Sequence, residues 1–289
     1  MKLIKPSFEI IEQLPGLEGI YKIIEQAGRT CYKSFDKIIE DSAESFVNRM
    51  MSNHHLSVLE HGTVYLKVDS LKDRNDYRDI YDKYKANPYS KVLVARGFMS
   101  NRLYITSNYR VLVEHNWLDD LKYLCEPTEF YKKRVTVRMI CSIGTSREFN
   151  RHRASSISEQ STRYCNFSKD KFGNEVSFII PCWLNLPEGH IESEECVNLG
   201  NNEKMFLENL FLSEMRYLKL IKEGWQPQQA REVLPLATAT EVVYTAYISD
   251  WIHFFRLRCN EAAHPSAREL AIPLKEGFIK RGYINEKNE

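Results

Sequence analysis

The sequence predicts an α+β fold in which a mixed β-sheet is packed with helices. Segments with apolar residues at helical spacing are interspersed with short β-branched segments along the whole chain, and such elements pack in layers around a shared core. We find no internal repeat, no low-complexity run and no linker rich in Gly, Pro or Ser. A chain of 289 residues can bury a large core without disulfides. We therefore expect residues 1–289 to form one domain.

Six segments have the features of helices. In the strongest of them the helical pattern stops at Gly224, and the next begins at Pro227, which suits a first helical turn. Ser249 or Asp250 would cap the fifth helix. The predicted helices are residues 17–28, 39–51, 205–223, 227–233, 250–260 and 266–280.

Five segments have the features of strands. The first alternates between the two faces and carries the β-branched Val58, Thr63 and Val64. The third is apolar enough to lie centrally in a sheet. The predicted strands are residues 58–68, 103–106, 135–143, 177–180 and 241–247. Residues 69–91 are charged and rich in tyrosine, which indicates a solvated helix and loop, and we expect an insertion around residues 69–130. Residues 190–204 indicate a polar loop.

The charge balance and the cysteines restrict the class of protein. Lys+Arg 40 against Asp+Glu 39 leaves a net charge of +1, which disfavours binding to nucleic acid. The seven cysteines are an odd number and none has CxxC spacing, which favours a reducing compartment. No apolar run is long enough for a membrane span and no signal peptide is evident. We expect a cytoplasmic protein that binds a small anion.

Residues 147–163 are dense in arginine and serine. Arg147, Arg151, Arg153 and Arg163 fall within seventeen residues of this nearly neutral chain. Guanidinium groups bind phosphate through two parallel hydrogen bonds, so one phosphorylated ligand could gather them. Ser161 is two residues from Arg163, and in an extended segment both would face that ligand. The alternative is a surface loop whose arginines pair with scattered acids.

The order of residues in this segment resembles the signature of the flavin-dependent thymidylate synthases. The matching positions are Arg151, His152, Arg153, Glu159, Ser161, Arg163 and Tyr164. Three further stretches agree with the family: residues 54–61, with the upstream His-x-Ser-x-x-Glu-His pattern; residues 230–235, which contain Arg231; and residues 253–258, which contain His253 and Arg258. Residues 27–33 also resemble family sequence.

The resemblance implies an activity and a set of ligands. It implies the family fold and a flavoprotein methyltransferase that converts dUMP to dTMP, with 5,10-methylenetetrahydrofolate as carbon donor, FAD as hydride carrier and NADPH as reductant. It also implies a homotetramer whose sites are shared between subunits.

By the same resemblance, the residues expected at the site divide by ligand. Those expected to bind dUMP are Glu148, Arg151, Glu159, Ser161, Arg163, Arg231 and Arg258, of which Arg163, Ser161 and Arg258 are expected to act in catalysis. Those expected to bind FAD are His55, Ser57, Glu60, Arg151, His152, Arg153 and His253.

The chain departs from the family pattern at three positions. Glu148 replaces a frequent Gln, Tyr247 a frequent Asn and Ser249 a frequent Arg. Because the last two positions meet the far end of the flavin in relatives, we assign no adenine contacts to this chain.

Other interpretations remain open. His54, His55, Glu60 and His61 lack a recognised metal-ligand spacing, and we expect no metal. Cys182 follows a proline, as the nucleophile of the unrelated cysteine-dependent synthases does, but its surroundings are apolar. The absence of GxGxxG argues against a Rossmann crevice. A nucleotide- or RNA-binding module and a different flavoprotein oxidoreductase are the rival functions.

Overall fold

The computed structural model describes residues 1–192 and 199–285. At its centre lies a four-stranded antiparallel sheet in the order β2-β6-β10-β7. Its strands are β2 (Ser7–Ile11), β6 (Arg134–Ser142), β10 (Ala239–Tyr247) and β7 (Ser156–Glu159). Val137 and Met139 of β6 and Val242 and Tyr244 of β10 are almost completely buried, which places these two strands in the middle of the core.

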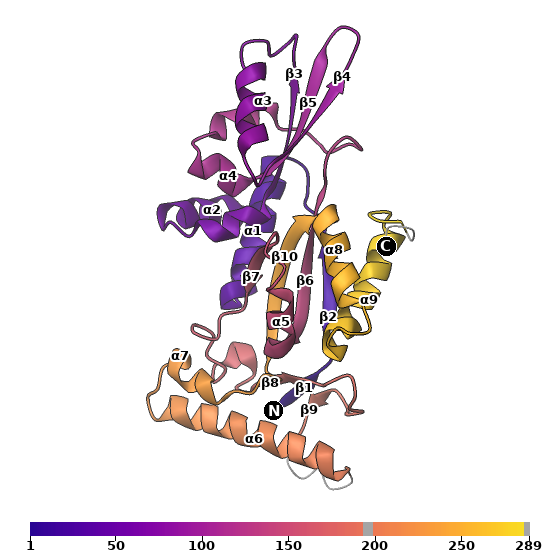
Figure 1. Cartoon of the computed structure of the whole chain (residues 1–289). Coiled ribbons are helices and arrows are strands. Elements are labelled where there is room, and N and C mark those ends of the chain that lie inside the picture. Colours follow the sequence, from indigo (N-terminus) through magenta and orange to yellow (C-terminus); the bar gives the residue numbers. More distant parts are fainter. Residues whose placement is uncertain (193–198, 286–289) are drawn as a thin grey trace.

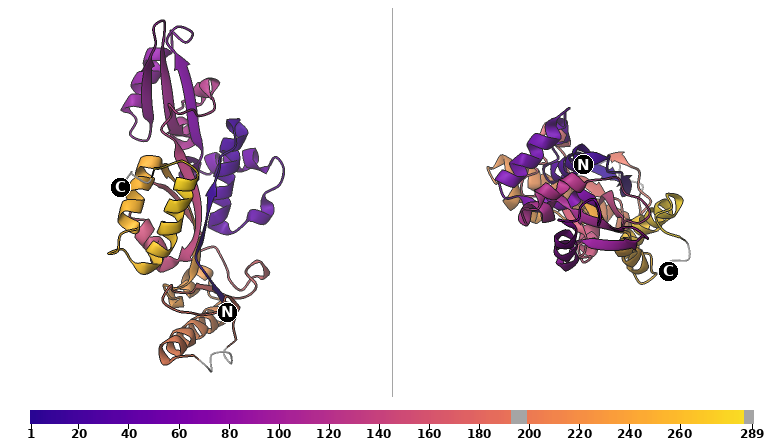
Figure 2. Two further views of the ribbon diagram at one scale, coloured as in Figure 1. Left: turned by 90° about the vertical axis from the view of Figure 1, so that its right-hand side faces the viewer. Right: turned by 90° about the horizontal axis from the view of Figure 1, so that it is seen from above.

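Helices cover both faces of this sheet (Figure 2). One face packs against α5 (Ile143–Phe149), α8 (Ile248–Arg258) and α9 (Pro265–Lys280), which supply Trp251, Phe255 and Phe278 to the core. The other face packs against α1 (Gly16–Tyr32) and the short 3-10 helix η2 (Leu56–His61), with α2 (Ser42–Ser52) outside them. The predicted site segments therefore emerge on two opposite faces of one sheet.

A lobe built from residues 63–123, here called the upper lobe, extends the molecule at one end (Figure 1). It contains an antiparallel sheet in the order β3-β5-β4, flanked by helices. The elements are β3 (Thr63–Asp69), α3 (Tyr77–Ala86), β4 (Lys91–Arg96), β5 (Asn101–Asn108), α4 (Tyr109–Glu114) and η3 (Leu118–Tyr123). Its apolar side chains share one core with Ile20 and Ile24 of α1 and Phe46 of α2.

The opposite end carries a small sheet and the longest helix (Figure 1). The sheet has the order β8-β1-β9, in which β1 pairs parallel with β8 and antiparallel with β9. The elements are β1 (Lys2–Ile4), η1 (Phe35–Lys37), η4 (Asp170–Phe172), β8 (Ser177–Ile179), β9 (Gly189–His190), α6 (Asn201–Lys222), α7 (Pro227–Ala230) and η6 (Arg231–Val233).

The predicted α+β class is confirmed, with the strands divided among three sheets. All six predicted helices are present, and none in the described part of the chain has the length and apolar character to cross a membrane. The helix predicted at 205–223 begins earlier, at Asn201, while residues 193–198 of the predicted loop lie outside the described residues.

Two local predictions are wrong. Residues 58–61 form the end of η2 and the strand begins at Thr63, because Val58, Leu59 and His61 are all buried and do not alternate between faces. The cap of α8 is Tyr247 rather than Ser249 or Asp250, because β10 runs directly into the helix.

Candidate functional site

The first group of predicted site residues lies between α5 and α8. Arg258 donates from Nε to His152 Nε2 at 3.0 Å, from Nη1 to Glu148 Oε2 at 3.1 Å and from Nη2 to the Glu148 carbonyl at 2.5 Å. The exposed Arg151 lies 3.8 Å from the same carboxylate. The His253 ring is 5.9 Å from that of His152. Although His152 and Arg258 are 106 residues apart in sequence, the five residues form one cluster: Glu148, Arg151, His152, His253 and Arg258.

His152 is the buried member of this cluster, and its ring is neutral. Burial lowers its pKa to about 4, and the charges of Arg258 and His253 act in the same direction. Since Nε2 accepts from Arg258, the proton of the neutral ring is assigned to Nδ1. His152 thus orients the Arg258 guanidinium.

The second group lies at the turn after β7. Arg231 Nη1 donates to Thr162 Oγ1 at 3.1 Å, and the Arg163 amide donates to Ser161 Oγ at 3.3 Å. The Arg163 guanidinium lies over the Tyr164 ring at 5.3 Å, and that ring packs against Tyr32 of α1. The predicted extended geometry is wrong here: residues 162–164 form a turn. Even so, the turn gathers Ser161, Arg163 and Arg231 on the side of the sheet that carries α1.

Glu159 faces the opposite side of the sheet from this turn. Its carboxylate accepts from Ser146 Oγ at 2.8 Å, Thr240 Oγ1 at 3.1 Å and Asn150 Nδ2 at 3.3 Å. Ser146 is on α5 and Asn150 directly follows it, so Glu159 ties that helix to the sheet close to the first group.

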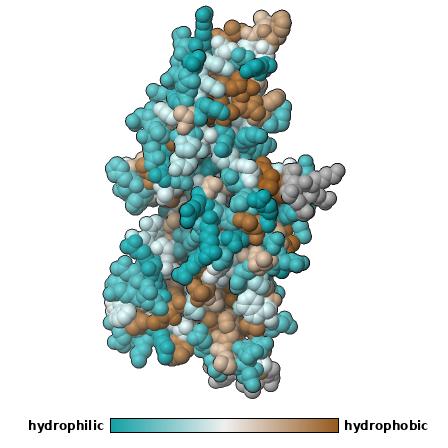
Figure 3. All heavy atoms as spheres, in the orientation of Figure 1, coloured by the Kyte–Doolittle hydropathy of each residue, from teal (hydrophilic) through white to brown (hydrophobic). Residues whose placement is uncertain are grey.

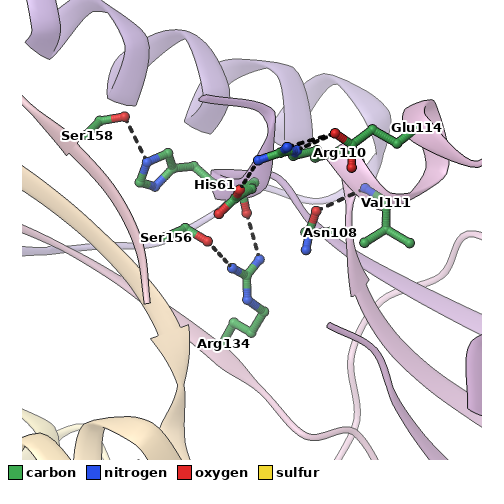
Figure 4. Close-up of polar contacts among 9 residues, drawn as sticks. His61, Asn108, Arg110, Val111, Glu114, Arg134, Ser156 and Ser158 are labelled. Carbon is green, nitrogen blue, oxygen red and sulfur yellow. Dashed lines mark hydrogen bonds and ion pairs between the residues drawn. The ribbon is translucent and has the colours of Figure 1, made fainter. Parts of the chain in front are cut away.

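The third group is on and around η2 (Figure 4). His55 and Ser57 are exposed, and the half-buried Glu60 accepts through Oε1 from Arg110 Nη1 at 2.5 Å. His61, by contrast, is completely buried between Thr245 Oγ1 at 2.8 Å and Ser158 Oγ at 3.0 Å. Burial lowers its pKa to about 3, so His61 is a neutral core residue that joins η2 to the sheet.

Two arginines of this third group were not among the predicted residues. Arg110 lies on α4 of the upper lobe and also contacts Glu114 at 2.8 Å. Arg134 donates from Nη1 to the Glu60 carbonyl at 2.9 Å and from Nη2 to Ser156 Oγ at 2.9 Å. Their partners at Glu60 are 50 and 74 residues away in sequence, and no motif contains them, so no local signal could have identified them.

The exposed donors of the first and third groups suit a phosphate-bearing cofactor such as FAD. Arg153 is exposed, and no ion pair or hydrogen bond engages its side chain within the described residues. His55, Ser57 and His253 are also exposed. Strongly hydrophilic residues gather over the middle of the face in Figure 3, where Figure 1 places α5 and β7. The donor set therefore fits the cofactor that the resemblance implies.

The two other chemistries considered from the sequence gain no support. Within residues 1–192 and 199–285, no three His, Cys, Asp or Glu side chains gather as metal ligands. Partial burial raises the pKa of the Cys182 thiol, and the nearby Glu269 adds to the effect, so this cysteine lacks the thiolate character of a nucleophile.

The three groups remain separate within one chain. No hydrogen bond or ion pair between described side chains links the Arg258 cluster, the Arg163 turn and η2. The helices α8 and α1 lie on opposite faces of the central sheet (Figure 2). Arg258 is on α8, whereas the Arg163 turn packs through Tyr164 against Tyr32 of α1.

Comparison with known proteins gives a consistent result. The model of the family described as thymidylate synthase complementing protein matches residues 12–72 and 99–281, and passes over residues 73–98 of the upper lobe. A flavin-dependent thymidylate synthase from Geobacter sulfurreducens is 31% identical over 133 residues, which is 46% of this chain and 50% of the relative. One from Pyrococcus furiosus is 29% identical over 144 residues, which is 50% of this chain and 53% of the relative.

These alignments are partial. The chain spans about half the length of these two curated relatives. Among solved structures, a UMP/dUMP methylase PolB from Streptomyces cacaoi, bound with 5-Br dUMP, is 15% identical. The match covers 97% of this chain and 93% of that one, with a TM-score of 0.44.

Proposed function

This chain belongs to the flavin-dependent thymidylate synthase family, and from that premise we propose that it converts dUMP to dTMP. The proposed co-substrates are 5,10-methylenetetrahydrofolate and NADPH, and the proposed cofactor is FAD. The proposal rests on the arginines gathered around Arg258 and around the Arg163 turn. The family motif supplies exposed guanidinium groups at Arg151, Arg153 and Arg163. Arg231 and Arg258 join them from distant segments of the chain.

The arginine groups would bind and polarise the nucleotide. We assign Arg151, Arg231 and Ser161 to the phosphate of dUMP, since guanidinium and hydroxyl donors match its oxygens. Arg163 and Arg258 would contact the uracil. C5 of uracil is a weak nucleophile, and positive charge beside the carbonyl oxygens stabilises the negative charge that develops as C5 attacks.

Other residues would hold these groups in place. The Glu148 carboxylate and the neutral His152 ring fix the Arg258 guanidinium, and Glu159 fixes α5, so the arginines keep their orientation when dUMP leaves. We assign His55, Ser57, Glu60, Arg153 and His253 to the binding of FAD. When bound, FAD would supply the hydride that reduces the transferred methylene group to methyl.

A visible absorption spectrum and a tritium-release assay test the proposal. The purified protein, incubated with FAD and desalted, should retain the flavin absorption bands. With dUMP tritiated at C5, methylenetetrahydrofolate and NADPH, it should release tritium and form dTMP. A protein that stays colourless and binds RNA in a salt-dependent manner would instead be a binding module, and a yellow protein that releases no tritium would be a different flavoenzyme.

A further inference from the structure

One arginine of the upper lobe contacts the segment proposed to bind FAD. Arg110 Nη1 lies 2.5 Å from Glu60 Oε1, and its Nε and Nη2 both lie 2.8 Å from Glu114 Oε1. The guanidinium therefore bridges a carboxylate of its own helix and one from η2. The Arg110 and Glu60 side chains are 34% and 29% exposed, so the pair is partly screened from water but still open to a ligand.

The backbone around Arg110 is held in a defined position. Asn108 Oδ1 accepts from the Val111 amide at 3.1 Å and so caps α4 (Figure 4), while the Tyr109 amide donates to the Gly62 carbonyl at 2.8 Å. Farther along the lobe, the Tyr247 hydroxyl bonds to the carbonyls of Tyr89 at 2.9 Å and Thr106 at 3.0 Å. The start of α4 is thus fixed relative to both η2 and the central sheet.

Glu60 is contacted by two arginines, one at its backbone carbonyl and one at its carboxylate. Arg134 binds its backbone carbonyl and is itself anchored to Ser156, which fixes the end of η2. Arg110 binds only one side-chain oxygen, Oε1. The other oxygen, Oε2, accepts no hydrogen bond from any described residue. Among the described residues, Arg110 is therefore the one hydrogen-bond donor to this carboxylate, and it sets the direction of Oε2 on a side chain whose backbone is already fixed.

We propose that Arg110 is a positioning residue for the flavin cofactor and that it acts through Glu60. By holding Oε1 and neutralising the carboxylate, it leaves Oε2 available to a hydrogen-bond donor of FAD and limits repulsion of the cofactor phosphates. The upper lobe would then contribute to cofactor binding through Arg110. This inference rests on the proposed function.

A double-mutant cycle on FAD affinity tests the inference, with binding followed by the quenching of flavin fluorescence. Arg110→Met should raise the Kd for FAD about tenfold, as expected for a partly buried charge-assisted contact. Arg110→Lys should raise it only about threefold, because a point charge cannot serve two carboxylates as a guanidinium does. If Arg110 acts through Glu60, the double variant Arg110→Met/Glu60→Gln should bind no more weakly than the weaker single variant.

A matched control separates positioning from a general effect on the lobe. Arg78→Met removes another arginine of the upper lobe, which pairs with Asp82 four residues on at 3.0 Å, and should leave the Kd unchanged. A wild-type Kd in both Arg110 variants, or additive effects in the double variant, would overturn the inference alone. Should wild-type protein bind no FAD, the proposed function falls as well, so the two failures are distinguishable.

Discussion

Arg163 is an exposed side chain, and within the described residues a tyrosine ring rather than a carboxylate lies against its guanidinium. We expect Arg163→Ala to lose at least a hundredfold in kcat/KM for dUMP, or about 3 kcal/mol, as is typical when a charged contact to a reacting group is removed. Stability should change little, because the side chain is solvated. Steady-state kinetics and a thermal unfolding scan measure the two effects.

Arg163→Lys distinguishes charge from shape at the same position. A lysine restores the charge but not the planar fork, so it should recover little of the lost rate. Turnover of Arg163→Ala close to that of the wild type would remove Arg163 from the proposed site.

His61 gives a prediction about stability and pH. Its pKa is about 3 in the folded protein, far below the ordinary value of about 6.5 in an unfolded chain. The unfolded state therefore binds the proton more readily, and the stability contributed by the neutral ring is complete above pH 6.5 and is lost as pH falls toward 3. Between pH 7.5 and 5 this single residue should cost about 2 kcal/mol of unfolding free energy.

Urea unfolding at the two pH values measures that cost. His61→Gln can still bond to Thr245 or Ser158 but carries no proton equilibrium, so its unfolding free energy should fall less steeply with pH than that of the wild type. Equal slopes in the two proteins would show that His61 is not the group responsible.

The sequence motifs named candidate site residues but not the side chains that surround them. Glu148, His152 and Arg258 do meet in space, although Arg258 is 106 residues from His152. Burial and the charge of Arg258 lower the pKa of His152, and neither cause can be recognised in the motif. A motif states which residues serve one ligand, but contacts such as Arg110 with Glu60 depend on tertiary packing alone.

At the scale of elements, Tyr247 explains one departure from the family pattern. Its hydroxyl lies 2.9 Å and 3.0 Å from two carbonyls of the upper lobe, those of Tyr89 and Thr106, which share its one proton, and an Asn at this position is too short to reach them in the same way. We expect Tyr247→Phe to cost about 1–2 kcal/mol, because the carbonyls lose a buried donor. The loss should be local: amide exchange should increase in β4 and β5 and stay slow in β6 and β10.

Hydrogen-exchange mass spectrometry resolves these segments. Tyr123→Phe is a suitable control, because the Tyr123 hydroxyl bonds to Asp76 within the lobe and makes no contact with the central sheet. Faster exchange in β6 after Tyr247→Phe, or unchanged exchange in β4 and β5, would contradict the role assigned to this hydroxyl.

The long elements were predictable and the short ones were not. β6 and β10 are nine residues long each and most of their residues are apolar, so their burial could be predicted from composition. β2 and β7 have five and four residues, and β7 reads Ser-Ile-Ser-Glu, a sequence without strand character. It is a strand because its backbone pairs antiparallel with β10, and contacts of Ser156, Ser158 and Glu159 with Arg134, His61 and Ser146 add to this pairing.

At the scale of the whole molecule, the sequence predicts one core with helices around it but not how the strands divide among sheets. Pairing of β1 with β8 brings together residues about 175 positions apart, and nothing local encodes that register. The separation of the predicted site residues onto two faces is equally hard to predict from sequence, because Arg151 and Arg163, which lie on different faces, belong to one motif that crosses the sheet edge at β7.

That separation predicts a site assembled from several subunits. Each layer packed on a sheet lies roughly 10 Å from it, so layers on its two faces are farther apart than that, and Arg258 lies on α8 while Arg163 lies beside α1. A single dUMP that contacts both would lie between two copies of the chain. We therefore expect an oligomer in light scattering, a homotetramer if the family resemblance holds for the number of subunits, and activity when two inactive variants are mixed. Arg163→Ala and Arg258→Ala, unfolded and refolded together in equal amounts, should form about a quarter of their sites with both arginines intact. Activity near that fraction of wild type supports a shared site, whereas a mixture as inactive as its components would place both arginines of each site in the same subunit.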